Sequence, residues 1–414
     1  MIKIFNIKTL PLAVLLLICF QLSSQNIWIK RASIASSKRE RSVGFSIGSR
    51  GYIGLGQDTL NLMLNDFWEY DPGTNSWTQK ANFAGVARRD AVGFAIGTKG
   101  YVGTGMDNAS APLGTTHSDF WEYDPTTNMW SMKAAYPGNF GAGVYYATGW
   151  AVANKGYVCC GKAGVAYYIS ELWEYDPAFN SWTQKAYYPG GNRIEGVAFV
   201  IGNIAYFGTG SDEATFKNDF YKYNAATDTW TPITSFPGSE RYSCSAFTIG
   251  GKGYIMFGMD GGYKDELWEY DPAVDFWFAK APIPGGARKS SCAFAIGGRG
   301  YAGTGKGPTG TRKDFWQYLP SITAGIDENT ENIISSVYPN PMTDNSTVVL
   351  SEEIFNNNKE LYWELTAVDG KLIQTEKITT TEFSLSKNDA AAGIYFLSIR
   401  SSSTILGTKK IVIQ

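Results

Sequence analysis

The feature that most constrains this chain of 414 residues is a unit that recurs six times. One phrase, DFWEYDPGTNSW at 66–77, returns in variant form at 119–130, 171–182, 219–230 and 266–277, with a truncated sixth copy at 314–320. A second phrase, such as GFAIGTKGYVGTG at 93–105, precedes every copy. Each unit predicts four short antiparallel strands, and self-similarity at this period is typical of rings or arrays of small sheets.

The glycine-Tyr-glycine phrase, followed by Tyr-Asp-Pro and Trp, resembles the kelch repeat over roughly 26–320. This resemblance implies an all-β fold, a six-bladed kelch β-propeller. The sixth copy stops at Pro320 without its Trp strand, whereas a spare Trp strand stands at 27–30. We therefore expect this N-terminal strand to complete the sixth blade, because closure of the ring removes an exposed sheet edge.

The first 25 residues have the layout of a secretory signal peptide. Lys3 and Lys8 precede an apolar run at 10–20, and small and polar residues follow up to Gln25. The run is too short to cross a bilayer, so we expect no membrane span in the mature chain. Adjacent cysteines such as Cys159 and Cys160 form only a strained ring disulfide, so buried free thiols are expected.

Length variation separates a constant frame from a variable face. The spacing from the first-strand aromatic residue to the second-strand Tyr is seven residues in all six units. Insertions are confined to two connections, the one between the second and third strands and the one between consecutive units. In an up-and-down sheet these connections lie on the same side, and binding residues concentrate on variable loops held by a rigid scaffold. This face is the predicted binding surface.

One charged position recurs on that face. An arginine stands six residues before the first-strand aromatic in five units, and Val144 replaces it in the third. Because an acid starts the third strand of every unit, the arginines fit either one structural bridge per blade or a ring that binds ligands. Residues that differ between units distinguish a structural role from a ligand-binding role better than the repeated arginines do, and Glu40 and Arg89 are among them. The predicted binding face comprises Arg39, Arg88, Asp90, Arg193, Glu195, Glu240, Arg241, Tyr242 and Arg288.

The composition changes after Pro320. Residues 321–335 are polar and predict a linker, while 336–414 alternate as in a small Ig-like β-sandwich, with a hairpin turn at Asp369-Gly370. This region resembles the C-terminal sorting domain of type IX (Por) secretion. The motif residues are Pro339, Asn340, Pro341, Gly393, Tyr395, Lys409 and Lys410. The resemblance implies the type IX secretion machinery as partner, and passage through the periplasm to the outer surface or surroundings of a Gram-negative bacterium.

Composition excludes several functions. The single histidine, His117, expected in a solvated loop, rules out metal sites built on two or three histidines, and no metal or cofactor is expected. The net charge of −2 gives no basic field for nucleic acid. Copper-radical galactose oxidases are secreted kelch proteins, but their chemistry requires two histidines and is therefore rejected for this chain.

Three functional hypotheses follow. The first is a secreted, non-catalytic module that binds a glycan or a protein through the variable face. The second is a sugar mutarotase or epimerase resembling the six-bladed sialic acid mutarotases, with Arg193 and Glu195 as weak catalytic candidates. The third is a purely structural or adhesive surface component.

Overall fold

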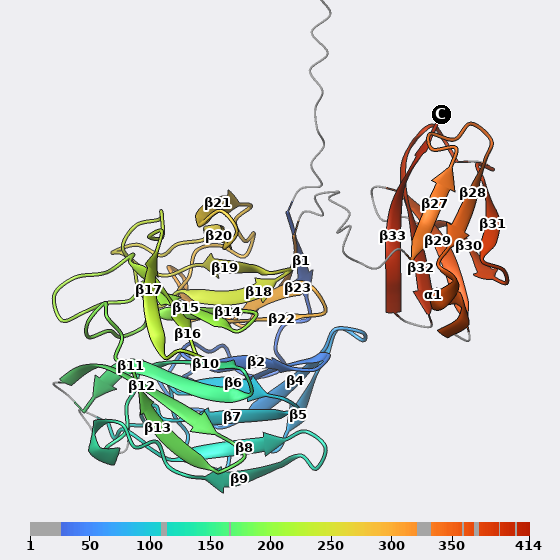
Figure 1. Cartoon of the computed structure of the whole chain (residues 1–414). Helices are drawn as coiled ribbons and strands as arrows, with labels where there is room; N and C mark the ends of the chain where they lie inside the picture. Colours follow the sequence, from blue (N-terminus) through green and yellow to red (C-terminus); the bar gives the residue numbers. More distant parts are fainter. Residues whose placement is uncertain are drawn as a thin grey trace, which may run out of the picture. The chain divides into compact units, whose positions relative to one another are not determined.

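The computed structural model describes residues 26–108, 114–164, 167–320, 333–357, 360–367, 372–388, 390–401 and 404–414. The predicted signal peptide, most of the predicted linker and the Asp369-Gly370 turn lie outside these residues. The chain divides into two compact units, of which Asn26–Pro320 forms one by itself. The elements of both units are labelled in Figure 1.

The strands of Asn26–Pro320 form six four-stranded antiparallel sheets, numbered here sheet 1 to sheet 6 in chain order. Sheets 1 to 5 each use four consecutive strands. Sheets 1 and 2 contain β2 (Val43–Ile47), β3 (Arg50–Gly54), β4 (Phe67–Asp71), β5 (Ser76–Lys80), β6 (Val92–Ile96), β7 (Lys99–Gly103), β8 (Phe120–Asp124) and β9 (Met129–Lys133). Sheets 3 to 5 contain β10 (Thr148–Val152), β11 (Lys155–Ala163), β12 (Tyr167–Asp176), β13 (Ser181–Lys185), β14 (Val197–Ile201), β15 (Ile204–Gly208), β16 (Phe220–Asn224), β17 (Thr229–Ile233), β18 (Ser245–Ile249), β19 (Lys252–Met256), β20 (Leu267–Asp271) and β21 (Phe276–Lys280).

Sheet 6 joins the two ends of this unit. It contains β22 (Cys292–Ile296), β23 (Arg299–Gly303), β26 (Phe315–Leu319) and β1 (Ile27–Arg31). β1 runs antiparallel to β26, with Ile27 opposite Leu319 and Arg31 opposite Phe315. This confirms the predicted role of the N-terminal strand. A small hairpin of β24 (Lys306–Gly307) and β25 (Gly310–Thr311) lies between β23 and β26.

The first strands of the six sheets contact one another in a closed ring, β2, β6, β10, β14, β18 and β22, and β22 returns to β2. The arrangement is β-propeller-like (Figure 1). Small residues permit this approach. A Cβ added to Gly51 would lie 2.3 Å from the ring of Phe294 in the neighbouring sheet, and one added to Gly93 would lie 2.8 Å from Val43 Cβ. Glycine at these positions is therefore a packing requirement.

The repeated tryptophans of the outer strands tie neighbouring sheets together. Trp77 packs edge-on against Phe315 at 5.0 Å, and its Nε1 donates to the carbonyl of Ala32 at 2.8 Å. Trp130 repeats both contacts with Phe67 and Ala81 one sheet further on. A buried indole that finds an acceptor for its N–H contributes both apolar area and orientation. These tryptophans therefore serve the framework.

The described residues of the C-terminal unit form two antiparallel sheets. One contains β27 (Ile334–Tyr338), β28 (Asn345–Leu350) and β31 (Glu382–Ser386); the other contains β29 (Leu361–Ala367), β30 (Leu372–Ile378), β32 (Gly393–Ser401) and β33 (Thr404–Ile413). A single apolar core, including Val348, Trp363 and Ile411, joins them. Two details differ from expectation. A helix, α1 (Glu352–Asn357), interrupts the predicted all-β pattern, and β27 begins inside the predicted linker 321–335.

Several sorting-motif residues hold the ends of these strands. Asn340 Oδ1 accepts a hydrogen bond from the backbone N–H of Val412 at 2.8 Å. The hydroxyl of Tyr395 donates to the carbonyl of Ala391 at 2.8 Å, close to Gly393 at the start of β32. Lys409 Nζ donates to the carbonyl of Ile334 at 3.2 Å. The Pro339-Asn340-Pro341 segment is thereby attached to the last strand, which also carries Lys410.

The four cysteines of the described residues are free thiols. Cys159, Cys160 and Cys292 are buried, and the Sγ atoms of the adjacent pair lie 3.2 Å apart. Across the described ranges, no helix combines the length and the apolar character required to cross a membrane.

Candidate binding site at the mouth of the central cavity

The five repeated arginines are buried, none more than 1% exposed. In sheet 4, the two terminal nitrogens of Arg193 donate to the two carboxylate oxygens of Asp219 at 2.6 and 3.0 Å, and Nη1 also reaches the carbonyl of Thr209 at 2.7 Å. The other pairs are Arg39–Asp66, Arg88–Asp119, Arg241–Glu266 and Arg288–Asp314. Each guanidinium is paired with a carboxylate of its own sheet. The geometry therefore supports one structural bridge per sheet rather than a ring of arginines presented to a ligand.

The bridges to Asp66, Asp119 and Asp314 favour the ionised carboxylate. Burial acts to raise the pKa of Asp66, but the hydrogen bonds and positive charge of Arg39 outweigh it, so that the pKa lies below its ordinary value. The pKa values of Asp119 and Asp314 are lowered in the same way, by Arg88 and Arg288 against burial.

Sheet 3 departs from this pattern. Val144 occupies the arginine position and is fully buried. Glu171 instead accepts hydrogen bonds from Trp173 Nε1 at 2.9 Å and from the backbone N–H of Asn139 at 3.1 Å. The latter donor comes from a 3₁₀ turn, η1 (Asn139–Gly141), which lies in the inserted part of this connection. The insertion thus replaces the missing guanidinium with a backbone donor.

A second set of equivalent residues lies two positions further along each connection. Unlike the arginines, these residues vary between sheets, with five residue types at six positions: Arg41, Asp90, Tyr146, Glu195, Ser243 and Ser290. All six have positive φ, between 52° and 58°. The backbone N–H groups of five of them (Arg41, Asp90, Glu195, Ser243 and Ser290) donate to the carbonyl of the preceding member, and Arg41 closes the circle onto Ser290. Non-glycine residues in this conformation cost free energy and cluster at ligand sites. We call these six residues the mouth ring.

The mouth ring borders a central cavity of about 200 Å³. The cavity is lined by the three residues that follow each ring member in the chain, namely 42–44, 91–93, 147–149, 196–198, 244–246 and 291–293. Every sheet contributes equally, so the ring encircles one end of a cavity on the axis of the unit.

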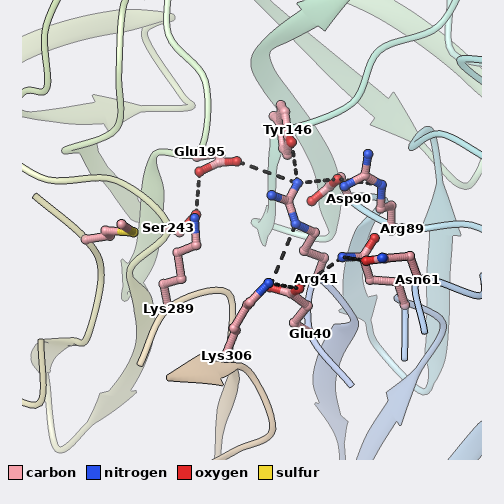
Figure 2. A network of polar contacts seen from close by, with 12 residues as sticks. Glu40, Arg41, Asn61, Arg89, Asp90, Tyr146, Glu195, Ser243, Lys289 and Lys306 are labelled. Carbon is pink, nitrogen blue, oxygen red and sulfur yellow. Dashed lines mark hydrogen bonds and ion pairs between the residues drawn. The ribbon is translucent and has the colours of Figure 1, made fainter. Parts of the chain in front are cut away.

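The side chains of five mouth-ring residues, all except Ser290, form one polar network, shown in Figure 2. Arg41 Nη1 lies 3.0 Å from Asp90 Oδ2 and 3.9 Å from Glu195 Oε1, and it also donates to the hydroxyl of Tyr146. Ser243 donates to Glu195 from the next sheet. The side chain of Arg41 is 14% exposed, and those of Asp90 and Glu195 less. One guanidinium thus connects residues from four sheets at the centre of the face.

Asp90 is the carboxyl group of this network whose pKa is shifted towards neutral pH. Burial raises the pKa of Asp90 to about 6, even though the charges of Arg41 and Arg89 act to lower it, and the negative charge of Glu195 adds to the increase. Two carboxylates that share one arginine are not both fully compensated. Asp90 therefore exchanges its proton close to neutral pH.

The residues that directly precede the mouth ring form a rim: Glu40, Arg89, Tyr145, Ile194, Tyr242 and Lys289. Five of them are bridged through the backbone to the connection between the second and third strands of their sheet, as Glu40 is to Gln57, and Tyr145 is bridged to Lys162 near the end of the second strand, β11. The two variable connections therefore lie side by side on one face, as the spacing predicted. Tyr242 packs against Phe216 at 4.9 Å and lies under Lys289, whose Nζ is 4.8 Å from the ring centroid. The rim thus adds aromatic faces to the charged centre.

The structure brings together only part of the predicted site. Asp90 and Glu195 lie in the mouth ring and Tyr242 in the rim, whereas Glu240 is exposed on the connection before them. The predicted catalytic pair is separated, because Arg193 is bound to Asp219 and the guanidinium beside Glu195 belongs to Arg41.

Sequence reasoning missed Arg41 and Tyr146. Both residues stand four positions before the first-strand aromatic of their unit, Phe45 and Trp150 respectively. Variation of the residue type at this position between units is the sequence pattern that could have identified them.

His117 also differs from expectation. Its Nε2 lies 3.1 Å from Asp107 Oδ2, and its side chain is only 16% exposed. Burial and then the nearby charge of Arg88 lower the pKa of His117, against the opposing effect of the aspartates. It is therefore a partly enclosed residue rather than a solvated one. In the part of the chain that the structure describes, no three His, Cys, Asp or Glu side chains gather to hold a metal.

Comparisons with known proteins address the two units separately. Residues 336–414 match the family described as "Secretion system C-terminal sorting domain", which supports handling by the type IX secretion machinery and export to the cell surface or the extracellular space. A search of curated proteins by sequence finds no match. A solved structure titled "Structure of YjhT" matches with a TM-score of 0.58 and 15% sequence identity, covering 69% of this chain and 96% of that one. At this identity the likeness concerns the fold, and it agrees with a propeller-like arrangement.

Proposed function

We propose that the chain is an exported six-bladed kelch propeller that binds a glycan, without catalysis, at the mouth ring and rim. In this proposal residues 1–25 are a signal peptide removed on export, 26–320 are the propeller, and 321–335 link it to an Ig-like sorting domain at 336–414. The sorting-domain match supports the exported location, where glycans of the cell surface and the surroundings are accessible.

The observation that carries the proposal is the mouth ring. Six positions with the same backbone conformation present five different kinds of side chain, and five backbone hydrogen bonds link neighbouring members. A site that is rigid before the ligand arrives loses little conformational entropy on binding. The ring offers carboxylates, a guanidinium and hydroxyls for sugar hydroxyl groups, while Tyr242 in the rim offers an aromatic face for a sugar ring.

The first test is a glycan array followed by calorimetry with the best ligand. Arg89→Ala and Tyr242→Ala remove a charge and an aromatic face from the rim and should each weaken binding at least about tenfold, of the order found for interface hot spots. The matched control is Arg50→Ala, because Arg50 pairs with Asp71 at the opposite end of sheet 1. If neither rim substitution changes binding, this face is not the binding site. If the chain captures proteins and no glycan, the ligand is a protein and the glycan proposal is wrong.

Sugar mutarotation is a second candidate, favoured by one observation. A carboxyl group with a pKa of about 6 beside an arginine can both accept and donate a proton near neutral pH, as general acid–base catalysis of ring opening requires. Proton NMR of anomer exchange in a reducing sugar from the array separates the two functions. The binding proposal expects an unchanged exchange rate. A faster rate that disappears in Asp90→Asn would establish catalysis instead.

A further inference from the structure

Two lysines stand opposite each other on the sheet 6 side of the mouth. The backbone N–H of Lys289 donates to the carbonyl of Lys306 at 2.9 Å, and the N–H of Lys306 returns the bond to Lys289 at the same distance. Residues paired in this way have neighbouring side chains, and two like charges directly opposite destabilise the pairing. Lys289 belongs to the rim, next to the mouth ring.

The equivalent bridges of the other five sheets provide an internal comparison. They are Glu40–Gln57, Arg89–Met106, Tyr145–Lys162, Ile194–Ser211 and Tyr242–Met259. None of them pairs two charges of the same sign. Two bridges elsewhere on the face do, Arg39–Arg312 and Lys264–Arg288, but each contains an arginine held by a carboxylate of its own sheet. The Lys289–Lys306 pair is therefore a local feature of sheet 6 that the framework does not require.

The ammonium groups of the pair are poorly compensated. Lys289 Nζ donates to the hydroxyl of Tyr242 at 3.3 Å, and no carboxylate of the described residues lies within 4 Å of it. Lys306 Nζ is 3.6 Å from Glu40 Oε1, and its side chain is 43% exposed. Glu40 is itself shared, because Gln57 donates to it at 2.9 Å and Arg41 Nε lies 4.0 Å away.

The net charge of this part of the mouth also shows that its cations are incompletely compensated. The mouth ring and rim carry three cations, from Arg41, Arg89 and Lys289, and Lys306, the bridge partner of Lys289, adds a fourth. Figure 2 shows these four cations gathered around three carboxylates. The carboxylates are those of Glu40, Asp90 and Glu195. With all groups ionised, these four positive and three negative charges leave an excess of one positive charge, and Lys162, the bridge partner of Tyr145, is a further cation on this face.

We infer that Lys289 and Lys306 form a subsite for an oxyanion, a carboxylate, sulfate or phosphate carried by the ligand. Each ammonium has three N–H donors, and an oxyanion between them would accept hydrogen bonds from both while removing their mutual repulsion. The inference rests on the proposed function for its location and adds to it the class of ligand, an acidic glycan. Tyr242 fixes Lys289 from below, and Glu40 holds Lys306 at the edge.

The test uses the full exported chain and a matched pair of sugars, D-glucuronate and D-glucose, together with inorganic phosphate and inorganic sulfate. We expect glucuronate to bind at least about tenfold more tightly than glucose, with an affinity that falls as salt is added. The double substitution Lys289→Gln and Lys306→Gln should abolish that preference. Lys264→Gln is the control, because Lys264 lies on the same face but is paired with Asp260 at 2.7 Å.

The outcomes separate this inference from the proposed function. If glucose and glucuronate bind equally and the double variant binds both as the wild type does, the oxyanion subsite is refuted while glycan binding stands. If phosphate or sulfate binds in a lysine-dependent way and no sugar does, the subsite stands and the glycan proposal fails. Thermal unfolding gives a readout without ligand. Lys289→Gln removes no ion pair of the described residues, so it should raise Tm by relieving repulsion, and a lower Tm would contradict the electrostatic argument.

Discussion

Arg39 and Arg41 stand two residues apart in one connection, and each is paired with an aspartate, yet the two pairs behave differently. Arg39 is enclosed, and its partner Asp66 has a pKa below the ordinary value. Arg41 serves Asp90, Glu195 and Tyr146 together, and the pKa of Asp90 is raised to about 6. The first pair recurs in five sheets, whereas the second occurs once. Repetition thus marks the framework, and variation at equivalent positions marks the mouth.

The largest expected effect compares a framework bridge with its exception. Asp219→Asn leaves the buried Arg193 without a charged partner and should lower the free energy of unfolding by about 3 kcal/mol, as found when one member of a buried ion pair is removed. Glu171→Gln in sheet 3 lacks such an arginine and keeps acceptors for Trp173 and Asn139, so its cost should stay below about 1 kcal/mol. Urea unfolding measures both. Equal losses would mean that the repeated bridges add no more than ordinary hydrogen bonds.

Lowering the pH should reduce the free energy of unfolding by a smaller amount for each Arg–Asp pair. Because the pKa values of Asp66, Asp119 and Asp314 are lower folded than unfolded, their contribution is complete above the ordinary pKa and is lost as pH falls through the folded values. The free energy of unfolding should therefore decrease steadily below about pH 4. Asp314→Asn, compared with wild type at pH 5 and pH 2.5, should show a shallower decrease. If the free energy of unfolding decreases equally in the variant and the wild type, Asp314 does not contribute to the acid sensitivity.

The smallest effect concerns Asp90. Its contribution to stability depends on pH with the opposite sign to that of the bridged aspartates. Because its folded pKa is raised, the folded state binds this proton more tightly than the unfolded state does, and Asp90 by itself makes the fold more stable as pH falls from 7 towards 4. Carbon-13 NMR of the side-chain carboxyl should show a midpoint near pH 6. Arg41→Gln should move that midpoint higher, because a charge that favours the ionised form is gone. A midpoint near 4 in wild type would show that Asp90 is fully compensated.

Much of the framework could be predicted from the sequence because its determinants are local and repeated. Aromatic and glycine spacing within each unit predicted the sheets, and the displaced Trp strand at 27–30 predicted the pairing of β1 with β26. The constant and variable spacings also identified the face on which the connections meet. The short helix α1 was missed because it occurs once, in a segment without a repeat for comparison.

The site was predictable only in part, because its contacts join residues far apart in the chain. Asp90 and Glu195 were selected as residues that differ between units, but their common partner Arg41 was not. The hydroxyl of Tyr146 reaches Arg41 across 105 residues of sequence, a contact that only ring closure creates. The repeated arginines fitted two roles in the sequence, and burial distinguishes them.

The closing strand has a consequence for the order of folding. β1 is the first described strand of the chain, and its only neighbour in sheet 6 is β26, the last strand of the same unit. A chain that emerges with its N-terminus first must hold β1 unpaired until all six repeats have followed. Pairing over so long a separation is slow compared with forming the hairpins inside each sheet. The ring therefore locks in a single late event, and a chain interrupted before residue 315 stays open and deformable in transit.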